Sequence, residues 1–202
     1  MTLRRKEGFP EWAVSILNHL QTSVRCRSAD YSTLLYESDE EGLLFYSTDV
    51  ESEEISSQET KLRSLRFLTP TTWCLYQQLP LPQEFSPTSL EPSLASSHIL
   101  VLNGMSPTHE REPDFNDWYS QEHIPMLSQA PGWIYSKRYR FVASSQDTEL
   151  PKYLAIHAWE NDLSFATGPY RAAVSTPWRT IVVNNVIARE RRVVRYVQRV
   201  YM

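Results

Sequence analysis

The stretch that decides the fold runs from residue 98 to residue 142 and reads HILVLNGMSPTHEREPDFNDWYSQEHIPMLSQAPGWIYSKRYRFV. It opens with a short apolar run, closed by Asn103 and Gly104, that is typical of a buried strand. Apolar residues then recur at helical spacing after Asp114, which we expect to cap a helix. The residues on that helix face are Phe115, Trp118, Tyr119, Glu122 and Met126.

Pro125 lies late in this helical pattern. Its ring would oppose the carbonyl of Gln121, so we expect the helix to kink or end close to His123. A turn at Pro131-Gly132 then leads into a predicted strand over 133–142. Alternation places Trp133, Tyr135, Lys137, Tyr139 and Phe141 on one side of that strand and Ile134, Ser136, Arg138, Arg140 and Val142 on the other. The pattern leaves open which side faces inward.

A third strand is predicted over 153–159. We expect its aliphatic residues, Leu154, Ile156 and Ala158, to meet the helices, and the opposite face to carry Tyr153, Ala155, His157 and Trp159. A second helix is expected to start at Thr176-Pro177, and a last strand covers 192–201. The order from 98 to 202 is therefore β-α-β-β-α-β, the split βαβ or ferredoxin-like unit, an α+β fold with one sheet face left for another cover.

The first half repeats this order from its first helix onward. Residues 9–12 open a helical stretch as residues 115–118 do, a hairpin of strands follows over 31–37 and 43–48, and a helix over 53–65 precedes a strand over 72–79. Only the opening strand has no counterpart, so the half either keeps three strands or takes an edge from elsewhere. We therefore predict an incomplete unit over 1–79, a Pro- and Ser-rich linker over 80–97 and a complete unit over 98–202.

Composition narrows the function classes. The 202 residues carry a formal net charge of −4, which gives no field to attract nucleic acid or an anionic membrane. The arginines at 189, 191, 192, 195 and 199 fall on a strand, where we interpret them as a solvated face. Cys26 and Cys74 form no disulfide or zinc pattern, and the basic start leads into no apolar segment. A cytoplasmic protein that neither spans nor binds a membrane is expected.

The second half resembles the dimeric α/β-barrel superfamily and, within it, the EthD-like proteins common in filamentous fungi. The residues that carry the resemblance are 115–127, Pro131-Gly132-Trp133, Arg138-Tyr139-Arg140 and 153–157. The resemblance implies two ferredoxin-like units in one chain, with their sheets packed face to face as a pseudo-dimeric barrel. Members include cofactor-free monooxygenases, polyketide cyclases, decarboxylases and isomerases. In the first half Leu17 stands where His123 would be, which implies one working pocket.

Two histidines are the candidate catalytic residues. His123, at a helix end beside a proline, is either a general acid or base or a surface or capping group. His157 is either directed into a central cavity between the two sheets or a buried histidine satisfied by a neighbour. If both rings reach one cavity, one can accept a proton while the other donates, as enolisation, cyclisation or decarboxylation of a carbonyl compound requires.

The candidate substrate-binding residues surround these rings. Trp118, Tyr119 and Tyr135 are cavity walls or core, Tyr153 and Trp159 share the strand face of His157, and Glu122 is a partner for Arg138. Arg138 binds a carboxylate or enolate, or else an ion-pair partner. No motif for a metal, nucleotide or flavin is present, so no cofactor is expected. The leading hypothesis is a cofactor-independent cyclase, isomerase or decarboxylase of secondary metabolism with a hydrophobic substrate. The alternative is a non-catalytic member that binds a ligand or a protein, and a further homodimer is left open.

Overall fold

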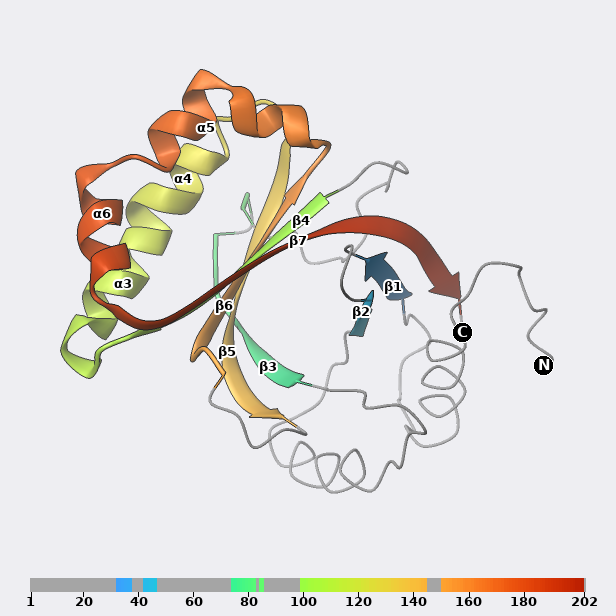
Figure 1. Ribbon diagram of the computed structural model, residues 1–202, viewed down its shortest axis with the longest axis horizontal. Coiled ribbons are helices and arrows are strands. Elements are labelled where there is room, and N and C mark those ends of the chain that lie inside the picture. Colours follow the sequence, from blue (N-terminus) through green and yellow to red (C-terminus); the bar gives the residue numbers. More distant parts are fainter. Residues whose placement is uncertain are drawn as a thin grey trace.

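The computed structural model describes residues 32–37, 42–46, 74–82, 84–85, 99–144 and 150–201. Seven strands form one antiparallel sheet, with helices on one of its faces (Figure 1). The strands are β1 (Ser32–Glu37), β2 (Gly42–Tyr46), β3 (Cys74–Leu79), β4 (Ile99–Pro107), β5 (Trp133–Ser144), β6 (Tyr153–Trp159) and β7 (Val186–Tyr201). The α-helices are α3 (Glu112–Trp118), α4 (Ile124–Leu127), α5 (Gly168–Ala173) and α6 (Pro177–Asn184). Short 3-10 turns cover His109–Arg111 and Asp162–Ala166.

The second half has the predicted ferredoxin-like fold. Its strands lie in the order β7-β4-β6-β5, which is the arrangement of a split βαβ unit with β4 and β6 at the centre. Helices α3 and α4 connect β4 to β5, and helices α5 and α6 connect β6 to β7. All four helices lie on the same face of the sheet (Figure 1). The Thr176-Pro177 signal is confirmed, because the Thr176 hydroxyl accepts the backbone N–H of Arg179 at 3.1 Å and caps α6.

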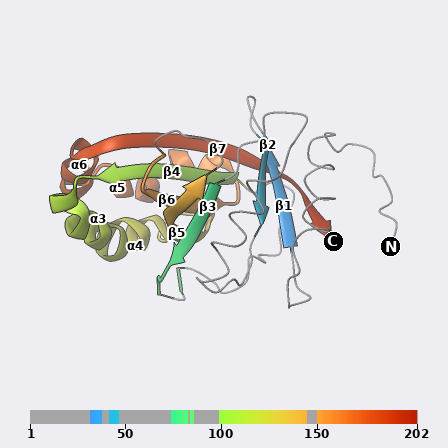
Figure 2. The ribbon, with the colours of Figure 1, turned by 90° about the horizontal axis from the view of Figure 1, so that it is seen from below.

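The two halves join edge to edge. The first part of β7 pairs with β4 and its last part pairs with β1, while β3 pairs with β5 (Figure 2). The full order is β2-β1-β7-β4-β6-β5-β3. If β1, β2 and β3 are the second, third and fourth strands of a ferredoxin-like unit, both junctions join a second strand to a fourth, as two-fold symmetry requires. An eighth strand would then fall between β2 and β3, the two ends of the described sheet.

The predicted strands of the first half are confirmed as β1, β2 and β3 within a few residues. The helices predicted from residue 9 and over 53–65 lie outside the described residues. The division into 1–79, 80–97 and 98–202 stays a prediction. No helix in the described ranges has the length and apolarity needed to span a membrane.

The predicted orientation of β6 is wrong. Tyr153 and Ala155 pack with residues of α3, and Trp159 packs with residues of α4 and α5, so this face meets the helices. Ile156 and Ala158 pack on the opposite side of the sheet with residues of β4, β5 and β7. Alternation correctly separated the two sets of residues. The aromatic set, however, packs against the helices, and the aliphatic set lies in the core on the opposite face of the sheet.

A bulge in β5 settles the face that the sequence left open. Trp133 pairs with Trp159, but Tyr135 pairs with Ala158, and the register shift lies between them. Ser136 and Arg138 therefore lie on the helix side together with Trp133, whereas Tyr135 lies on the opposite side in the aliphatic core. One extra residue in a strand moves everything before it to the other face.

The helix that carries His123 does not end there. Between α3 and α4 the chain forms a π-helical segment, Tyr119–His123, in which the N–H of Ile124 bonds to the carbonyl of Tyr119. Pro125 supplies no N–H for the next bond, which agrees with an irregularity at this point. Asp114 is not the N-cap, since α3 begins at Glu112 and the Asp114 carboxylate accepts the Trp178 indole N–H at 3.0 Å.

Candidate functional site

A cavity of about 50 Å³ lies between the helices and the sheet of the second half, and both candidate histidines line it. The cavity lining is Val101, Asn103, Met105, Trp118, His123, Leu127, His157, Trp159, Tyr170, Val174, Arg179, Arg189 and Arg191. The two rings therefore share a cavity, as predicted, but it lies on the helix side of β6 and not between two sheets. The reversed orientation of β6 accounts for this correction.

His123 is held by the π-helical segment with one ring nitrogen unoccupied. Its imidazole stacks on the indole of Trp118, with ring centroids 4.3 Å apart and planes inclined by 22°. The ring forms a hydrogen bond with the backbone of Ala173, and Nδ1 has no partner. Burial holds the pKa of His123 well below its usual value, and the nearby His157 and Arg179 lower it further. A neutral ring with its N–H on the backbone carbonyl leaves a free lone pair at Nδ1.

A short chain of hydrogen bonds fixes His157 in the tautomer that presents an N–H, not a lone pair, to the cavity. The Trp133 indole N–H, which can only donate, bonds to Ser136 Oγ at 3.2 Å, and Ser136 Oγ lies 2.8 Å from His157 Nδ1. Ser136 is fully buried, so its own hydrogen has to go to His157 Nδ1 to avoid an unsatisfied donor. The ring is then the Nε2–H tautomer, and Nε2 has no partner.

The direction in which burial shifts the pKa of His157 agrees with a neutral ring at physiological pH. Burial lowers this pKa from 6.5 to about 3, with smaller contributions from Arg138 and Arg191. The two ring centroids lie 5.7 Å apart, with their planes nearly perpendicular. One neutral imidazole thus presents a lone pair and the other presents an N–H within a single buried space. This is a complementary acceptor and donor for a bound molecule.

Unpartnered polar atoms gather around the two rings. Among the described residues, the buried side-chain atoms without a hydrogen-bond partner are Trp118 Nε1, Tyr119 Oη, His123 Nδ1, His157 Nε2 and Trp159 Nε1. Four of these five residues line the cavity, and the fifth, Tyr119, packs against both imidazoles. Since leaving such a group unpaired costs about 1–3 kcal/mol, this concentration indicates a site that a polar ligand or water fills.

The structure brings only some of the predicted substrate-binding residues to the cavity. Trp118 and Trp159 line it, and Tyr119 supports the histidines from behind. Tyr135 does not take part, because it lies in the core on the other face of the sheet. Tyr153 is also removed from the cavity, and its hydroxyl bonds to the carboxylate of Glu112.

Glu122 and Arg138 do not form the predicted pair. Glu122 accepts the hydroxyl of Thr176 at 2.5 Å and so joins the π-helical segment to the start of α6. Arg138 is buried, donates to Asn116 Oδ1 at 2.8 Å and lies over the Tyr119 ring, with 4.2 Å between the guanidinium carbon and the ring centroid. Both residues therefore support the walls of the site rather than line it.

Sequence reasoning missed Ser136 and the arginines of the cavity. Arg189 and Arg191 are exposed, as the sequence predicts for a solvated face, but their registers also place them beside Met105 and Asn103, so that they line the cavity. Their spacing of two on a strand was the available signal, since it puts both on one face. Nothing local in the sequence marks Ser136, whose role depends on the bulge in β5 and on the register with His157. The described residues hold no cluster of acidic, Cys or His side chains that fits a metal ion.

Searches with this chain find no matching family model and no similar curated protein. Solved structures are similar in fold. An anthrone oxidase-like protein superposes with a TM-score of 0.63 at 14% identity, over 95% of this chain and 88% of the other. A major regulator of staphylococcal pathogenesis gives a TM-score of 0.54 at 9% identity, over 95% and 96% of the two chains.

A third structure, a ferredoxin-fold protein from Listeria monocytogenes related to antibiotic biosynthesis monooxygenases, gives a TM-score of 0.47 at 13% identity, over 91% of this chain and 89% of the other. At these identities the likeness to the first two structures shows the fold alone, in agreement with the α+β ferredoxin-like order of the strands. Oxidase-like and regulatory proteins share it, so function has to be argued from the site.

Proposed function

We propose that this protein is a cofactor-independent enzyme that removes a proton from carbon next to a carbonyl group of a small hydrophobic molecule. The observation that carries the proposal is the pair of buried neutral imidazoles, one with a free lone pair and one with a free N–H, in the same cavity. The aromatic lining from Trp118 and Trp159 supports a flat or apolar substrate.

In the proposed step His123 Nδ1 takes the proton. The electrons of the broken C–H bond form a carbon–carbon double bond, and the carbonyl π electrons move to oxygen, which becomes an enolate. His157 Nε2–H donates a hydrogen bond to that oxygen, where the negative charge develops. His123 leaves the step as an imidazolium and returns its proton when the product is released.

The fate of the enolate decides the reaction class. Protonation at a different carbon makes the enzyme an isomerase, and attack on a second carbonyl makes it a cyclase. A decarboxylase would reach the same enolate by losing carbon dioxide, and His123 in its protonated form would then supply the proton. All three are kept in the proposal, because each passes through an enolate whose oxygen would accept a hydrogen bond from His157 Nε2–H.

An oxidase is the second candidate, on the basis of the name of the anthrone oxidase-like neighbour. The anion formed by deprotonating an anthrone is electron-rich, and its reaction with dioxygen gives the anthraquinone and one molecule of water. Dioxygen is small enough for a cavity of about 50 Å³. Such a volume holds a few water molecules, so the cavity has to open further before a substrate ring enters it.

The test is proton exchange at the α carbon, which the isomerase, cyclase and oxidase reactions require. We expect the protein in D2O to accelerate deuterium incorporation at the α carbon of 1-indanone, followed by mass spectrometry. His123→Ala and His157→Ala should each reduce the acceleration by about 100-fold or more. Tyr135→Phe is the control, since Tyr135 is equally buried but lies on the opposite face of the sheet. Equal exchange rates in the wild type and both histidine variants would contradict the proposal.

The non-catalytic alternative predicts a different result. A binding protein of this fold would bind 1-indanone or related ketones and would give no deuterium incorporation above the uncatalysed rate. Binding measured by quenching of tryptophan fluorescence is suitable because Trp118 and Trp159 line the cavity. Binding without exchange, over several ketones of different size, would favour this second function.

A further inference from the structure

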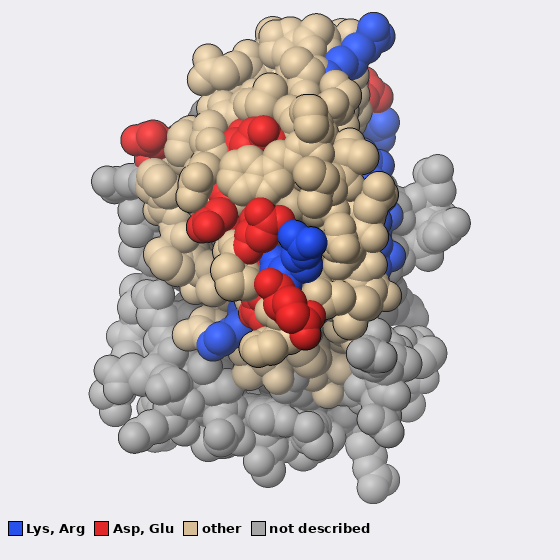
Figure 3. All heavy atoms as spheres, turned by 90° about the vertical axis from the view of Figure 1, so that its left-hand side faces the viewer, with Lys and Arg blue, Asp and Glu red and all other residues tan. Residues whose placement is uncertain are grey.

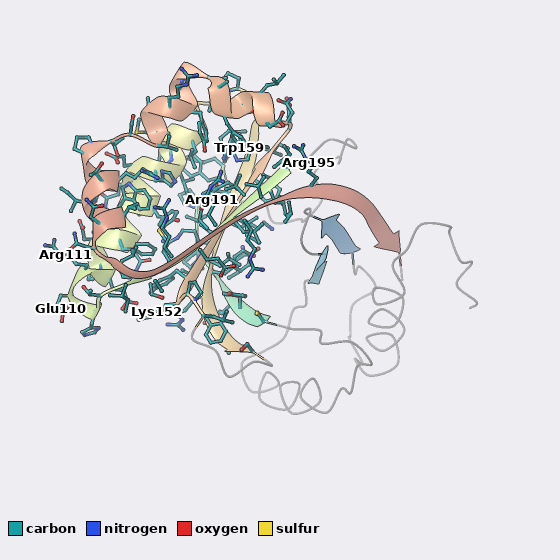
Figure 4. The ribbon with its side chains drawn as sticks, in the orientation of Figure 1. Glu110, Arg111, Lys152, Trp159, Arg191 and Arg195 are labelled. Carbon is teal, nitrogen blue, oxygen red and sulfur yellow. The ribbon has the colours of Figure 1, made fainter. Side chains whose placement is uncertain are left out.

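We infer that the cavity binds a substrate with a carboxylate, held at the cavity mouth by Arg179, Arg189 and Arg191. This inference rests on the proposed function, because it names the class of molecule that the same cavity takes. The three arginines come from α6 and β7 and line the space that holds both imidazoles. Arg191 is directed to the helix side of β7 (Figure 4).

None of the described residues that line this cavity is acidic. In the part of the chain that the structure describes, none of the three cavity arginines forms an ion pair, whereas neighbouring arginines of β7 do. Arg192 pairs with Glu190 on the other face of the strand, and Arg195 pairs with Asp162 at 3.1 Å. Acidic partners are therefore available along β7, but the cavity-facing positions are left without one.

Arg189 and Arg191 are exposed and Arg179 is half-buried, so three positive charges lie beside one small cavity and repel one another. Arg179 is partly buried, and its pKa is lowered by that burial and by the neighbouring Arg189. Arg179 and Arg191 also lower the pKa values of His123 and His157, respectively, so the positive field reaches both rings. An anion in this position would relieve the repulsion between the arginines.

The chemistry of the guanidinium group favours a carboxylate. A planar guanidinium presents paired N–H groups that match the two oxygens of a carboxylate. A nucleic acid does not fit this description, since its phosphates need a continuous basic surface. The helical face instead carries acidic side chains toward its centre, with basic ones mainly along one edge (Figure 3).

Binding of an anion would also strengthen the proposed base. The arginine field disfavours a positive charge on His123, and a carboxylate placed among the arginines would cancel part of that field. The pKa of His123 would then rise in the complex, which makes Nδ1 a better proton acceptor while the substrate is bound. A neutral analogue of the same shape would not have this effect.

The experiment compares benzoate with benzamide, which has the same shape without the charge. Each is titrated into the full chain and followed by backbone amide shifts in 1H–15N spectra. We expect benzoate to bind about tenfold or more tightly than benzamide, and Arg189→Gln and Arg191→Gln each to weaken benzoate several-fold with benzamide unchanged. Arg195→Gln is the matched control on the same strand, because Arg195 does not line the cavity and is bound to Asp162.

Equal affinities for benzoate and benzamide, or a preference for benzoate that survives both arginine variants, would overturn the inference. These outcomes are independent of proton exchange. If exchange depends on His123 while the two ligands bind equally, only the carboxylate site is wrong. If benzoate binds through Arg189 and Arg191 and no ketone exchanges, the carboxylate site stands and the proposed reaction does not.

Discussion

Replacing Ser136 by alanine should change both the stability of the protein and the protonation pattern of His157. The Ser136 hydroxyl is fully buried and links the Trp133 indole N–H at 3.2 Å to His157 Nδ1 at 2.8 Å. Without the hydroxyl, Nδ1 of the buried imidazole loses its donor, which costs about 1–3 kcal/mol. The half-buried Trp133 indole also loses its acceptor, so we expect a total loss of about 2–4 kcal/mol.

The tautomer is the more specific readout. In the wild type, donation from Ser136 to Nδ1 places the ring proton of His157 on Nε2, where it faces the cavity. In Ser136→Ala neither nitrogen has a protein partner, so the two tautomers should become comparable in population. Nitrogen-15 shifts of the imidazole, from spectra that connect each ring nitrogen to its carbon-bound protons, separate the two forms. Proton exchange from 1-indanone should fall in the same variant.

The control is Ser120→Ala. Ser120 is exposed in the π-helical segment, and its hydroxyl bonds only to backbone carbonyls of the preceding turn. Its replacement should change the free energy of unfolding by no more than about 0.5 kcal/mol. A wild-type His157 with its proton on Nδ1, or a Ser136→Ala protein with an unchanged tautomer, would refute the reasoning about this hydrogen-bonded chain.

Two further predictions concern stability. The folded-state pKa values of His123 and His157 lie below the ordinary 6.5, so below pH 6.5 the unfolded chain binds protons that the folded chain does not. Urea titrations should therefore show a free energy of unfolding that is steady above pH 6.5. Below pH 6.5 it should fall by about 1.4 kcal/mol per pH unit for each histidine. His157→Ala should remove about one of these two proton equivalents, and an unchanged slope would mean that His157 is already charged in the folded protein. Gly132→Ala should lower the melting temperature, because Gly132 has a φ of +80° and a Cβ there would collide with Ser164 Oγ. Gly168→Ala is the control and should have a much smaller effect, because nothing lies near the position of its Cβ. Equal shifts in melting temperature for the two variants would contradict this prediction.

Local patterns predicted most elements of the second half. The apolar run at 99–102, the helical spacing from Phe115 and the N-cap at Thr176 each depend on neighbours within a few residues. The same holds for the three strands of the first half. The ferredoxin-like unit of the second half followed from these signals, because the connections leave few alternatives.

Local patterns could not predict which face of β6 meets the helices. Apolar side chains cover both faces of this sheet, so the alternation shows which residues share a face but not which face meets the helices. The two sets are Tyr153, Ala155, His157 and Trp159 on one face and Leu154, Ile156 and Ala158 on the other. The bulge in β5 has the same character, since it arises from pairing with β6 and the extra residue, Ile134, is neither Gly nor Pro. Pro125 indicated an irregular helix, but it did not indicate that the irregularity would be a π-helical segment.

From the sequence alone came the fold class, the order of the elements in the second half and the two imidazoles as candidate groups for proton transfer. Their assembly into one cavity, the tautomer of His157 and the arginines at the mouth were decided by tertiary structure. The reason is physical: residues 123 and 157 meet only through strand register and helix packing, and the protonation pattern of each ring depends on a partner distant in the chain, Ser136 for one and Ala173 for the other.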